Sequence, residues 1–270
     1  MGSGMAANYL KNGYSVFVWN RNKERLSSLL EMGAIAKNTP KEIAAEVDIV
    51  FEVTANDASS RSVWFGEQGI LSGAKPNTVL VASGTFSVDW IIELASECAG
   101  KHFVFFDMPL TGGRHGAETG KLTFLVGGDE KILEDLRGDL SAVSQKILYF
   151  GKAGSGTQYK LLLNMLQAMH LIGLGEALRI AAMNGMDVKK VGDALAEHPG
   201  GTATNVAWKG YQQPPDPINF SVQWIAKDLG YARKLAGNMQ LPLLDGALEE
   251  YQKAIQKGLK EKDWTEINKI

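Results

Sequence analysis

The first 150 residues alternate between two patterns of apolar positions. Short runs rich in β-branched and aromatic residues, such as VDIVFEV and HFVFFDMP, are separated by stretches whose apolar residues recur every three or four positions. The runs predict buried strands and the stretches predict helices, and their regular alternation favours a parallel sheet covered on both faces. The expected strands are 14–20, 47–53, 77–83, 102–109, 121–128 and 146–151, and the expected helices are 1–13, 23–32, 59–65, 89–99 and 131–141.

Strand signals stop near Gly151, where a glycine-rich segment leads into a helix predicted over residues 151–185. This helix is apolar on nearly all sides, which is typical of a helix buried all round, so we expect a second subunit to complete its cover in a homodimer or homotetramer. The sequence predicts an α/β protein, with a Rossmann-type doubly wound sheet over 1–152 and an all-helical domain for substrate binding and dimerisation over 153–270. Further helices are expected over 188–197, 221–238 and 243–257, with loops at 198–205 and 212–217 and a short closing helix within 258–270.

The composition is that of an ordinary globular protein, because 45% of the 270 residues are hydrophobic, 21% are charged and the formal net charge is −2. Lysine and arginine are balanced by acidic residues and form no basic run, which argues against nucleic-acid binding. The one cysteine, Cys98, cannot form an internal disulfide and is interpreted as a small buried residue. Polar residues interrupt the long helix and no secretory signal opens the chain, so we expect a cytoplasmic protein with no membrane partner.

Two polar residues in the first turns of the long helix are the candidates for catalysis. Lys160 and Asn164 are four residues apart and therefore lie on one helix face. Partial burial lowers the pKa of a lysine toward neutrality, where its amine can both give and take a proton. Asn164 would orient an oxygen or the carboxylate of a substrate. A lysine and an asparagine at this spacing are common on helices, so the pair alone does not identify an enzyme.

A second candidate is DMPLTGG, residues 107–113, which follows a buried strand at the place where ligands gather in open α/β sheets. Thr111 offers a hydroxyl, and Gly112 and Gly113 let backbone N–H groups approach an anion such as a substrate carboxylate. The alternative is a tight turn whose glycines serve only the backbone conformation. Arg114 and His115 follow as further candidates for substrate contact, with a solvated turn residue as the alternative for His115.

The first expected strand is followed by Asn20, Arg21 and Asn22, where a doubly wound fold meets the adenosine ribose of a dinucleotide. An acidic residue there would bind the ribose hydroxyls of NAD, whereas the guanidinium of Arg21 would pair with the 2′-phosphate of NADP. Lys23 and Arg25 would add positive charge. The segment favours NADP as cofactor, with NAD as the second choice, and the alternative is an ordinary solvated arginine at the start of a helix.

The remaining polar residues carry weaker signals. His170 and His198 are interpreted as packing or loop residues, and no grouping of histidine, cysteine and carboxylates has the spacing of a metal site. Lys227 and Asp228 are expected to form a surface pair that contributes little to stability. The sequence therefore predicts no metal ion.

These segments, in this order, resemble the β-hydroxyacid dehydrogenase family, which includes 3-hydroxyisobutyrate dehydrogenases and reductases of glyoxylate or succinic semialdehyde. The resemblance covers essentially the whole chain. DMPLTGGRHGAETGKL, residues 107–122, is similar to the family's substrate-binding DxPVSGGxxxAxxGxL. GSGTQYKLLLN, residues 154–164, is similar to the segment that carries the catalytic lysine, and KDL at 227–229 is similar to a motif near the nicotinamide.

The resemblance implies a role for each matching residue. Lys160 becomes the general acid and base, while Thr111, Gly112, Gly113 and Asn164 become the substrate contacts. The implied cofactor contacts are Gly2, Ser3, Asn20, Arg21, Asn22, Val53, Thr54, Thr85 and Lys227, with Thr85 on the nicotinamide side. The implied reaction transfers hydride between NADP and a small β-hydroxy acid or aldehyde acid, of the 3-hydroxyisobutyrate, glyoxylate or succinic semialdehyde type. The alternative is a non-catalytic nucleotide-binding or scaffold protein of the same fold.

The chain also departs from the family pattern. Family members begin with a strand and GLGxMG, and Met1 and Gly2 match the last two residues of that motif. Without the strand and the other fingerprint glycines, we expect poor cofactor binding, two unpaired central strand edges, and a start assigned too late or a shortened chain. Thr111 stands where the family has serine, and SGT at 83–85 differs from the family's Asp-x-Ser-Thr.

Overall fold

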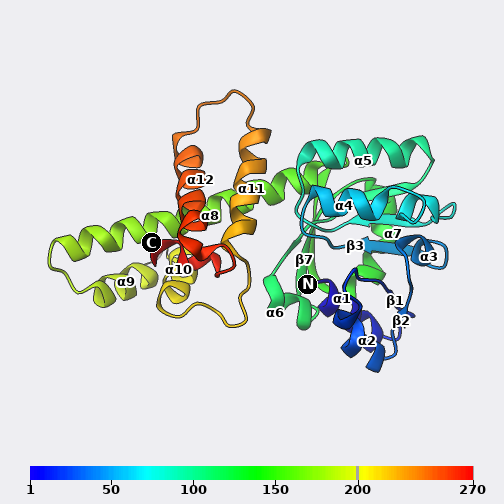
Figure 1. The fold of residues 1–270 in the computed structure, drawn as a ribbon, viewed down its shortest axis with the longest axis horizontal. Coiled ribbons are helices and arrows are strands. Elements are labelled where there is room, and N and C mark those ends of the chain that lie inside the picture. Colours follow the sequence, from blue (N-terminus) through cyan, green and yellow to red (C-terminus); the bar gives the residue numbers. More distant parts are fainter. Residues whose placement is uncertain (199–200, 270) are drawn as a thin grey trace. The chain divides into compact units, whose positions relative to one another are not determined.

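The computed structural model describes residues 1–198 and 201–269 and divides the chain into two compact units (Figure 1). Unit 1 comprises Met1–Lys160 and unit 2 comprises Leu161–Ile270. The division falls inside the long helix α8, Ser155–Met183, so the first residues of this helix belong to the α/β unit. The domain boundary expected after residue 152 stays a prediction.

Unit 1 is built on a six-stranded sheet with strands in the order β3-β4-β5-β7-β6, and β8 pairs with β7. The strands are β3 Ile49–Glu52, β4 Val79–Ala82, β5 Val104–Asp107, β6 Leu110–Thr111, β7 Leu122–Gly127 and β8 Ser144–Gly151. The first three are parallel, as the sequence predicts, whereas β7 runs antiparallel to β5 and to β6. A parallel neighbour requires a crossover of about a dozen residues or more, and the connection from β6 to β7 is shorter. The sheet is therefore mixed rather than parallel throughout.

Helices cover both faces of this sheet. The helices of unit 1 are α1 Gly2–Lys11, α2 Ser27–Glu31, α3 Pro40–Ala44, α4 Asp57–Trp64, α5 Val88–Gly100, α6 Gly113–Glu118 and α7 Glu130–Ser141. Alternate strand residues point to opposite sides, so Val79 and Val81 of β4 pack in one apolar cluster with α1 and α7, while Leu80 and Ala82 pack in another with α4 and α5. Figure 1 shows α4 and α5 lying together beside the sheet. The predicted cover of both faces is confirmed, and Cys98 of α5 is buried as expected.

The N-terminal part of unit 1 forms a separate two-stranded sheet, in which β1, Phe17–Val18, runs parallel to β2, Ile35–Ala36. Neither β2 nor α3 is predicted from the sequence. Both residues of β2 are exposed, so no apolar run marks this strand. The helix expected over 23–32 is divided into a 3-10 turn, Lys23–Leu26, and the short α2. Among the described strands, β1 pairs only with β2 and β3 pairs only with β4, so the expected pair of open edges is confirmed.

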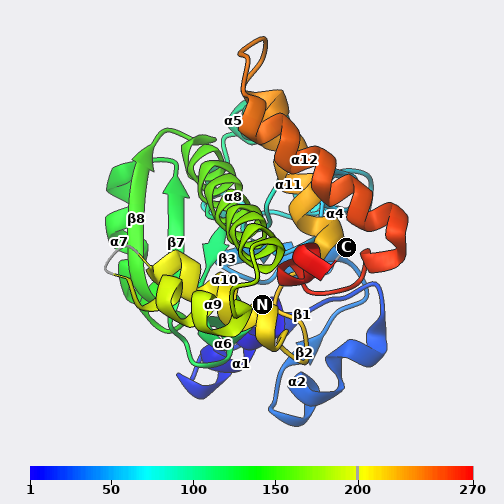
Figure 2. The ribbon, with the colours of Figure 1, turned by 90° about the vertical axis from the view of Figure 1, so that its left-hand side faces the viewer.

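Unit 2 consists of helices. After α8 these are α9 Val188–Glu197, α10 Thr202–Gln212, α11 Val222–Leu235 and α12 Pro242–Ala254, followed by a π turn at Ile255–Leu259 and a 3-10 turn at Trp264–Lys269. Helices α11 and α12 lie side by side (Figures 1 and 2). The loop expected over 198–205 is wrong from Thr202 onward, because the buried Trp208, whose indole donates to Asp193 at 2.9 Å, packs α10 as a helix. Residues 199–200 of that loop lie outside the described residues.

The long helix α8 is buried along one stripe rather than all round. Its buried residues include Leu161, Ala168, Leu171, Leu174 and Leu178, and its exposed apolar residues include Leu162, Leu166, Ile180 and Met183. By length and composition alone α8 could cross a membrane, but a packed core helix of this kind meets the same criterion. Asn268 donates to the Leu171 carbonyl at 2.7 Å, as expected of a helix packed within protein. Cover of the exposed stripe by a second subunit stays a prediction.

Candidate active site

Asp107, the last residue of β5, holds the start of α8. Its side chain is fully buried, and its two carboxylate oxygens accept hydrogen bonds of 2.7 Å each from the backbone N–H groups of Gly154 and Thr157. The first N–H groups of a helix have no partner within the helix, so a carboxylate there satisfies them and complements the helix dipole. Burial raises the pKa of Asp107 to about 7, against the opposing effect of the two backbone donors. The start of α8 is thereby fixed to the end of β5.

Close glycine packing fixes the same helix start to the sheet. A Cβ atom on Gly156 would collide with the backbone carbonyl oxygen of Leu125 and lie 2.9 Å from that of Asp107. A Cβ atom on Gly127 would collide with a carboxylate oxygen of Asp107. Only residues without a side chain allow this approach. Lys160, one turn beyond Gly156, is only 9% exposed, so this buried residue is carried by a helix start that is fixed to the sheet.

The segment predicted to bind a carboxylate is attached to β7, the strand that also lies against the start of α8. Thr111 lies on β6 and pairs with Thr123 of β7, the strand whose Leu125 lies against the start of α8. Gly112 and Gly113 follow with φ of 117° and 62°, which favour glycine, so the conformational explanation of these glycines holds at both positions. A Cβ on Gly113 would meet no atom within 4 Å, so its backbone also faces open space. The structure therefore joins the TGG turn and the lysine helix to one strand.

The neighbours of this turn have other partners. Arg114 pairs with Glu118 through Nε and Oε1 at 2.6 Å, and both side chains are about half exposed. This is an ordinary ion pair one turn apart on a helix, so a substrate contact by Arg114 stays a prediction without structural support. His115 is exposed on α6. His170 and His198 are also exposed, and no group of three or more metal-ligating side chains occurs within residues 1–198 and 201–269.

Unit 2 contains a buried polar cluster that contradicts the expected surface pair. Asp228 is fully buried and pairs with Lys227 at 3.0 Å, whose side chain is only 16% exposed. Asn164 donates its amide to the other oxygen of Asp228 at 2.6 Å. Lys227 also lies over the rings of Trp224 and Tyr231. Burial makes this cluster far more costly to break than a surface pair, and it fixes the orientation of the Asn164 amide.

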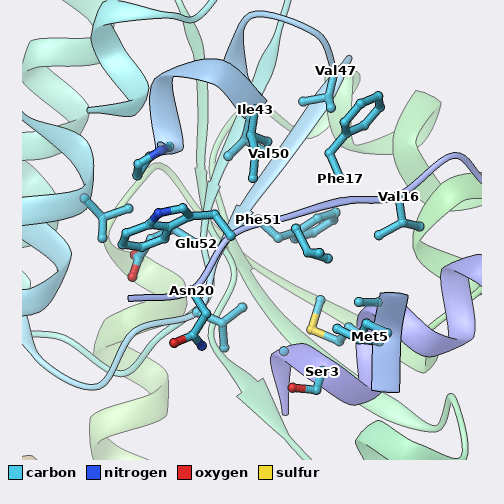
Figure 3. Close-up of a pocket in the computed structure, with 18 of the residues that line it drawn as sticks. Ser3, Met5, Val16, Phe17, Asn20, Ile43, Val47, Val50, Phe51 and Glu52 are labelled. Carbon is cyan, nitrogen blue, oxygen red and sulfur yellow. The ribbon is translucent and has the colours of Figure 1, made fainter. Parts of the chain in front are cut away.

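Most of the predicted cofactor residues line one cavity of about 750 Å³ in unit 1 (Figure 3). These are Gly2, Ser3, Asn20, Arg21, Val53 and Thr54. Asn20 accepts from the backbone N–H of Asn22 at 2.9 Å, and Asn22 accepts from that of Glu24 at 3.0 Å, so both asparagines shape the turn after β1. Arg21 is exposed at the same turn. The other three predicted cofactor residues, Asn22, Thr85 and Lys227, do not line this cavity.

The loop after β3 is organised by a buried carboxylate. Glu52 is 3% exposed and accepts hydrogen bonds from the Thr54 N–H at 2.8 Å, the Ser60 hydroxyl at 3.1 Å and the Trp64 indole at 3.2 Å. Burial raises the pKa of Glu52. A Cβ on Gly84 would lie 2.6 Å from the Thr54 carbonyl oxygen, so the loop that carries Thr85 packs against this one. Two of the predicted cofactor segments are therefore built together.

These residues have the chemistry that a dinucleotide requires. Helix α1 begins at Gly2 without a side-chain cap, so its first backbone N–H groups are suited to an anionic phosphate. A Cβ on Gly2 would lie 3.4 Å from Val53, which is ordinary contact. The Thr54 hydroxyl is buried and has no hydrogen-bond partner among the described residues. Together with the positive charge of Arg21, these donors fit a phosphate-bearing nucleotide.

From the sequence, Asp107 is expected only as part of the carboxylate-binding segment, Asp228 only as part of a surface pair, and Glu52 has no expected role. Asp107 and Glu52 are the acidic last residues of otherwise apolar strands, and burial of a carboxylate requires hydrogen-bonding partners. That signal marks Asp107 and Glu52 as organising residues, whereas Asp228 lies in a helix with other charged residues and carries no such signal. The partners of Asp107 and the contact of Asp228 with Asn164 could not be inferred, because these contacts join segments that are distant in the chain.

Comparison with known proteins decides the family. A family model described as the NAD binding domain of 6-phosphogluconate dehydrogenase matches residues 1–151, and one described as NAD-binding of NADP-dependent 3-hydroxyisobutyrate dehydrogenase matches residues 154–270. The chain belongs to the β-hydroxyacid dehydrogenase family. It is 30% identical to the "Probable 3-hydroxyisobutyrate dehydrogenase, mitochondrial" of Dictyostelium discoideum over 99% of this chain and 86% of that protein.

Two further relatives extend the family assignment. The 2-(hydroxymethyl)glutarate dehydrogenase of Eubacterium barkeri is 28% identical over 100% of this chain and 91% of its own length. The solved 3-hydroxyisobutyrate dehydrogenase of Mycobacterium tuberculosis, in complex with L-serine, superposes with a TM-score of 0.88 and 26% identity, over 100% of this chain and 94% of that one. This β-hydroxyacid dehydrogenase family member is therefore an oxidoreductase that uses a nicotinamide cofactor, as the resemblance implied.

Proposed function

We propose that this family member transfers hydride between NADP and the C–OH or C=O carbon of a small carboxylic acid. The substrate class is a β-hydroxy acid or an aldehyde acid, of the 3-hydroxyisobutyrate, glyoxylate or succinic semialdehyde type. The observation that carries the proposal is the buried Lys160 on a helix start that Asp107 and Gly156 fix to the sheet. A buried amine on a rigid support suits proton transfer, because its position is set before the substrate arrives.

Each of the site residues has a defined role in the proposed reaction. Lys160 gives its proton to the substrate oxygen during reduction and takes it back during oxidation. The substrate carboxylate is held by the Thr111 hydroxyl and by the backbone N–H groups of Gly112 and Gly113. Asn164 binds the substrate through the side-chain amide that Asp228 orients. Asp107 positions Lys160 through the backbone of α8. The nicotinamide, when bound, supplies or accepts the hydride.

The preference for NADP is proposed from the residues at the end of β1. Asn20 and Asn22 accept hydrogen bonds from nearby backbone N–H groups, and the charged side chain between them is that of Arg21. A guanidinium binds a phosphate through paired N–H groups, whereas the ribose hydroxyls of NAD are bound best by a carboxylate. The 2′-phosphate of NADP is thus the better partner, and Gly2, Ser3, Val53 and Thr54 would bind the rest of the nucleotide.

We also propose a cytoplasmic homodimer or homotetramer. Leu162, Leu166, Ile180 and Met183 leave an apolar stripe of α8 exposed in the single chain. A second copy that buries this stripe would remove apolar surface from water, which favours association.

A substrate and cofactor screen tests the proposal. NADPH oxidation is measured with glyoxylate and succinic semialdehyde, and with matched aldehydes that carry an amide in place of the carboxylate. We expect turnover only with the acids, and a kcat/KM for NADPH at least about tenfold above that for NADH, equivalent to about 1.4 kcal/mol. Equal turnover of acids and amides would contradict the carboxylate site. Tight NADPH binding without turnover of any compound would instead favour the non-catalytic alternative.

A further inference from the structure

Glu52 is the last residue of β3, and its side chain faces an apolar layer. Burial alternates along this strand, so Glu52 shares a face with Val50, which packs in one cluster with Trp64 of α4 and Trp90 of α5. A carboxylate in such a layer is costly unless hydrogen-bond donors surround it. An apolar residue would fill the same place without needing partners, so the reason for a carboxylate lies in the groups that it binds.

Side chains of the core hold one oxygen of this carboxylate. Its Oε2 accepts hydrogen bonds from the Ser60 hydroxyl at 3.1 Å and from the Trp64 indole at 3.2 Å. The Ser60 hydroxyl in turn accepts from the Trp90 indole at 2.9 Å. All three of these residues are at most 2% exposed. Donors from two helices, α4 and α5, therefore fix the carboxylate in one orientation.

The other oxygen holds the backbone of the loop that follows β3. Its partner is the Thr54 N–H, which donates to Oε1 at 2.8 Å, the shortest of the three hydrogen bonds to this carboxylate. Val53, Thr54 and Ala55 line the cavity that contains most of the predicted cofactor residues, and Glu52 lines it too (Figure 3). Val53 also lies against Gly2 at the start of α1. The second oxygen thus acts on the wall of the cavity rather than on the core.

The far end of the same loop is fixed independently. Asn56 caps α4 through a reciprocal pair of hydrogen bonds with Ser59. Asp57, the first residue of α4, accepts from the backbone N–H and the hydroxyl of Ser87 at 2.9 and 2.6 Å, and Ser87 caps α5. Residues 53–55 are therefore bounded by the helix caps on one side and by the buried carboxylate on the other.

We propose that Glu52 is a positioning residue for the cofactor. One carboxylate oxygen is anchored in the core and the other holds the Thr54 backbone, so residues 53–55 are fixed beside the start of α1 before a dinucleotide binds. Binding then does not have to order this wall, which preserves affinity. This role rests on the proposed cofactor contacts of Val53 and Thr54, and it is independent of the substrate and of Lys160.

A pair of variants that differ only in the acceptor at position 52 tests this role. Both carry Trp64→Phe, which removes the indole donor. In Glu52→Gln the amide oxygen can still accept from the Thr54 N–H while the amide NH₂ donates to the Ser60 hydroxyl. Glu52→Met has a similar length and no such acceptor. NADPH dissociation constants are measured by titration calorimetry at a temperature where circular dichroism shows both proteins folded.

We expect Glu52→Met to bind NADPH at least about tenfold more weakly than Glu52→Gln, which should stay within about threefold of the single variant Trp64→Phe. Hydrogen exchange of the Thr54 amide in the ligand-free proteins should be at least about tenfold faster in Glu52→Met than in Glu52→Gln.

Leu94→Ala is the control for stability. Leu94 is fully buried in the same apolar cluster and does not line the cavity. Its truncation should lower the melting temperature, as a cavity in a core does, and leave the NADPH dissociation constant within about twofold of wild type. A residue that only stabilised the core would instead change binding in proportion to the loss of stability.

Three results would overturn the role of Glu52. The first is equal NADPH affinity, or equal exchange of the Thr54 amide, in the two variants at position 52. The second is a loss of NADPH affinity in Leu94→Ala as large as that in Glu52→Met. The third is an absence of NADPH binding by the unmodified chain, which would contradict the cofactor contacts themselves. None of these measurements uses a substrate, so their failure is distinct from a failure to reduce aldehyde acids.

Discussion

The buried carboxylate that holds the start of α8 makes stability depend on pH. Burial raises the pKa of Asp107 from 3.8 to about 7. As the pH rises from 4 to 7, the unfolded chain loses this proton first, so the free energy of unfolding contributed by Asp107 falls and then levels off above pH 7. One pKa unit corresponds to about 1.36 kcal/mol, so the total loss is on the order of 4 kcal/mol.

Asp107→Asn removes the ionisation and keeps the shape of the side chain. The amide group can accept only one of the two backbone hydrogen bonds, which costs about 1–3 kcal/mol with an unpaired N–H at the helix start. That cost lowers the unfolding free energy of the variant by the same amount at every pH, and the pH-dependent contribution of Asp107 is absent from the variant. We therefore expect the difference in unfolding free energy between wild type and variant to fall by about 4 kcal/mol between pH 4 and pH 8.

Urea unfolding followed by circular dichroism at half-unit pH steps measures this difference. Asp129→Asn is the matched control, because Asp129 also caps a helix through two backbone N–H groups but lies at the surface. Subtracting the control corrects for the general loss of one carboxylate. A difference in unfolding free energy between wild type and Asp107→Asn that stays constant from pH 4 to pH 8 would mean that folding does not raise the pKa of Asp107. That result would refute the reasoning from its burial.

Three further predictions concern the helix start, the cofactor and unit 2. Gly156→Ala places a Cβ against the Leu125 carbonyl oxygen and should lower the unfolding free energy by about 2 kcal/mol or more. The control Gly173→Ala, in the same helix, places a Cβ where no atom lies within 4 Å and should be neutral or stabilising. Equal effects of the two variants in urea unfolding would contradict the close packing at Gly156. Arg21→Glu should raise the KM for NADPH at least about tenfold and leave that for NADH within about threefold, and steady-state kinetics showing a parallel change in both would remove Arg21 from the phosphate site. Asp228→Ala removes the ion-pair partner of the largely buried Lys227 and should lower the unfolding free energy by about 3–5 kcal/mol in the same assay. A decrease below about 1 kcal/mol is typical of a surface ion pair and would contradict the burial of this one.

The sequence was sufficient for the elements that bury continuous apolar runs. VDIVFEV, NTVLVAS and HFVFFDMP became β3, β4 and β5, because strands covered on both faces need apolar residues at every position. The exposed, two-residue β2 has no such pattern. Residues TATN at 202–205 favour turns locally, and the packing of Trp208 overrides that preference. The antiparallel direction of β7 depends on the path of the chain and is not encoded in periodicity.

The candidate site was predictable where a short motif carries it. Lys160 and the TGG turn were found from local spacing and family resemblance. The structure adds what supports them: the contacts of Asp107 with the start of α8, and those of Asp228 with Asn164 and Lys227. The contacts of Asp107 with Gly154 and Thr157 and that of Asp228 with Asn164 join residues 47 to 64 positions apart, and a single sequence has no local pattern that records such pairs.

Lys160→Ala tests the central claim most directly. Steady-state oxidation of NADPH with an aldehyde acid is compared for wild type, Lys160→Ala and the control Lys152→Ala, which removes an exposed lysine just before α8. If Lys160 is the acid and base, its removal should lower kcat about 10²–10⁴-fold, while the control and the NADPH dissociation constant stay near those of wild type. Activity of Lys160→Ala within about tenfold of wild type would contradict the account.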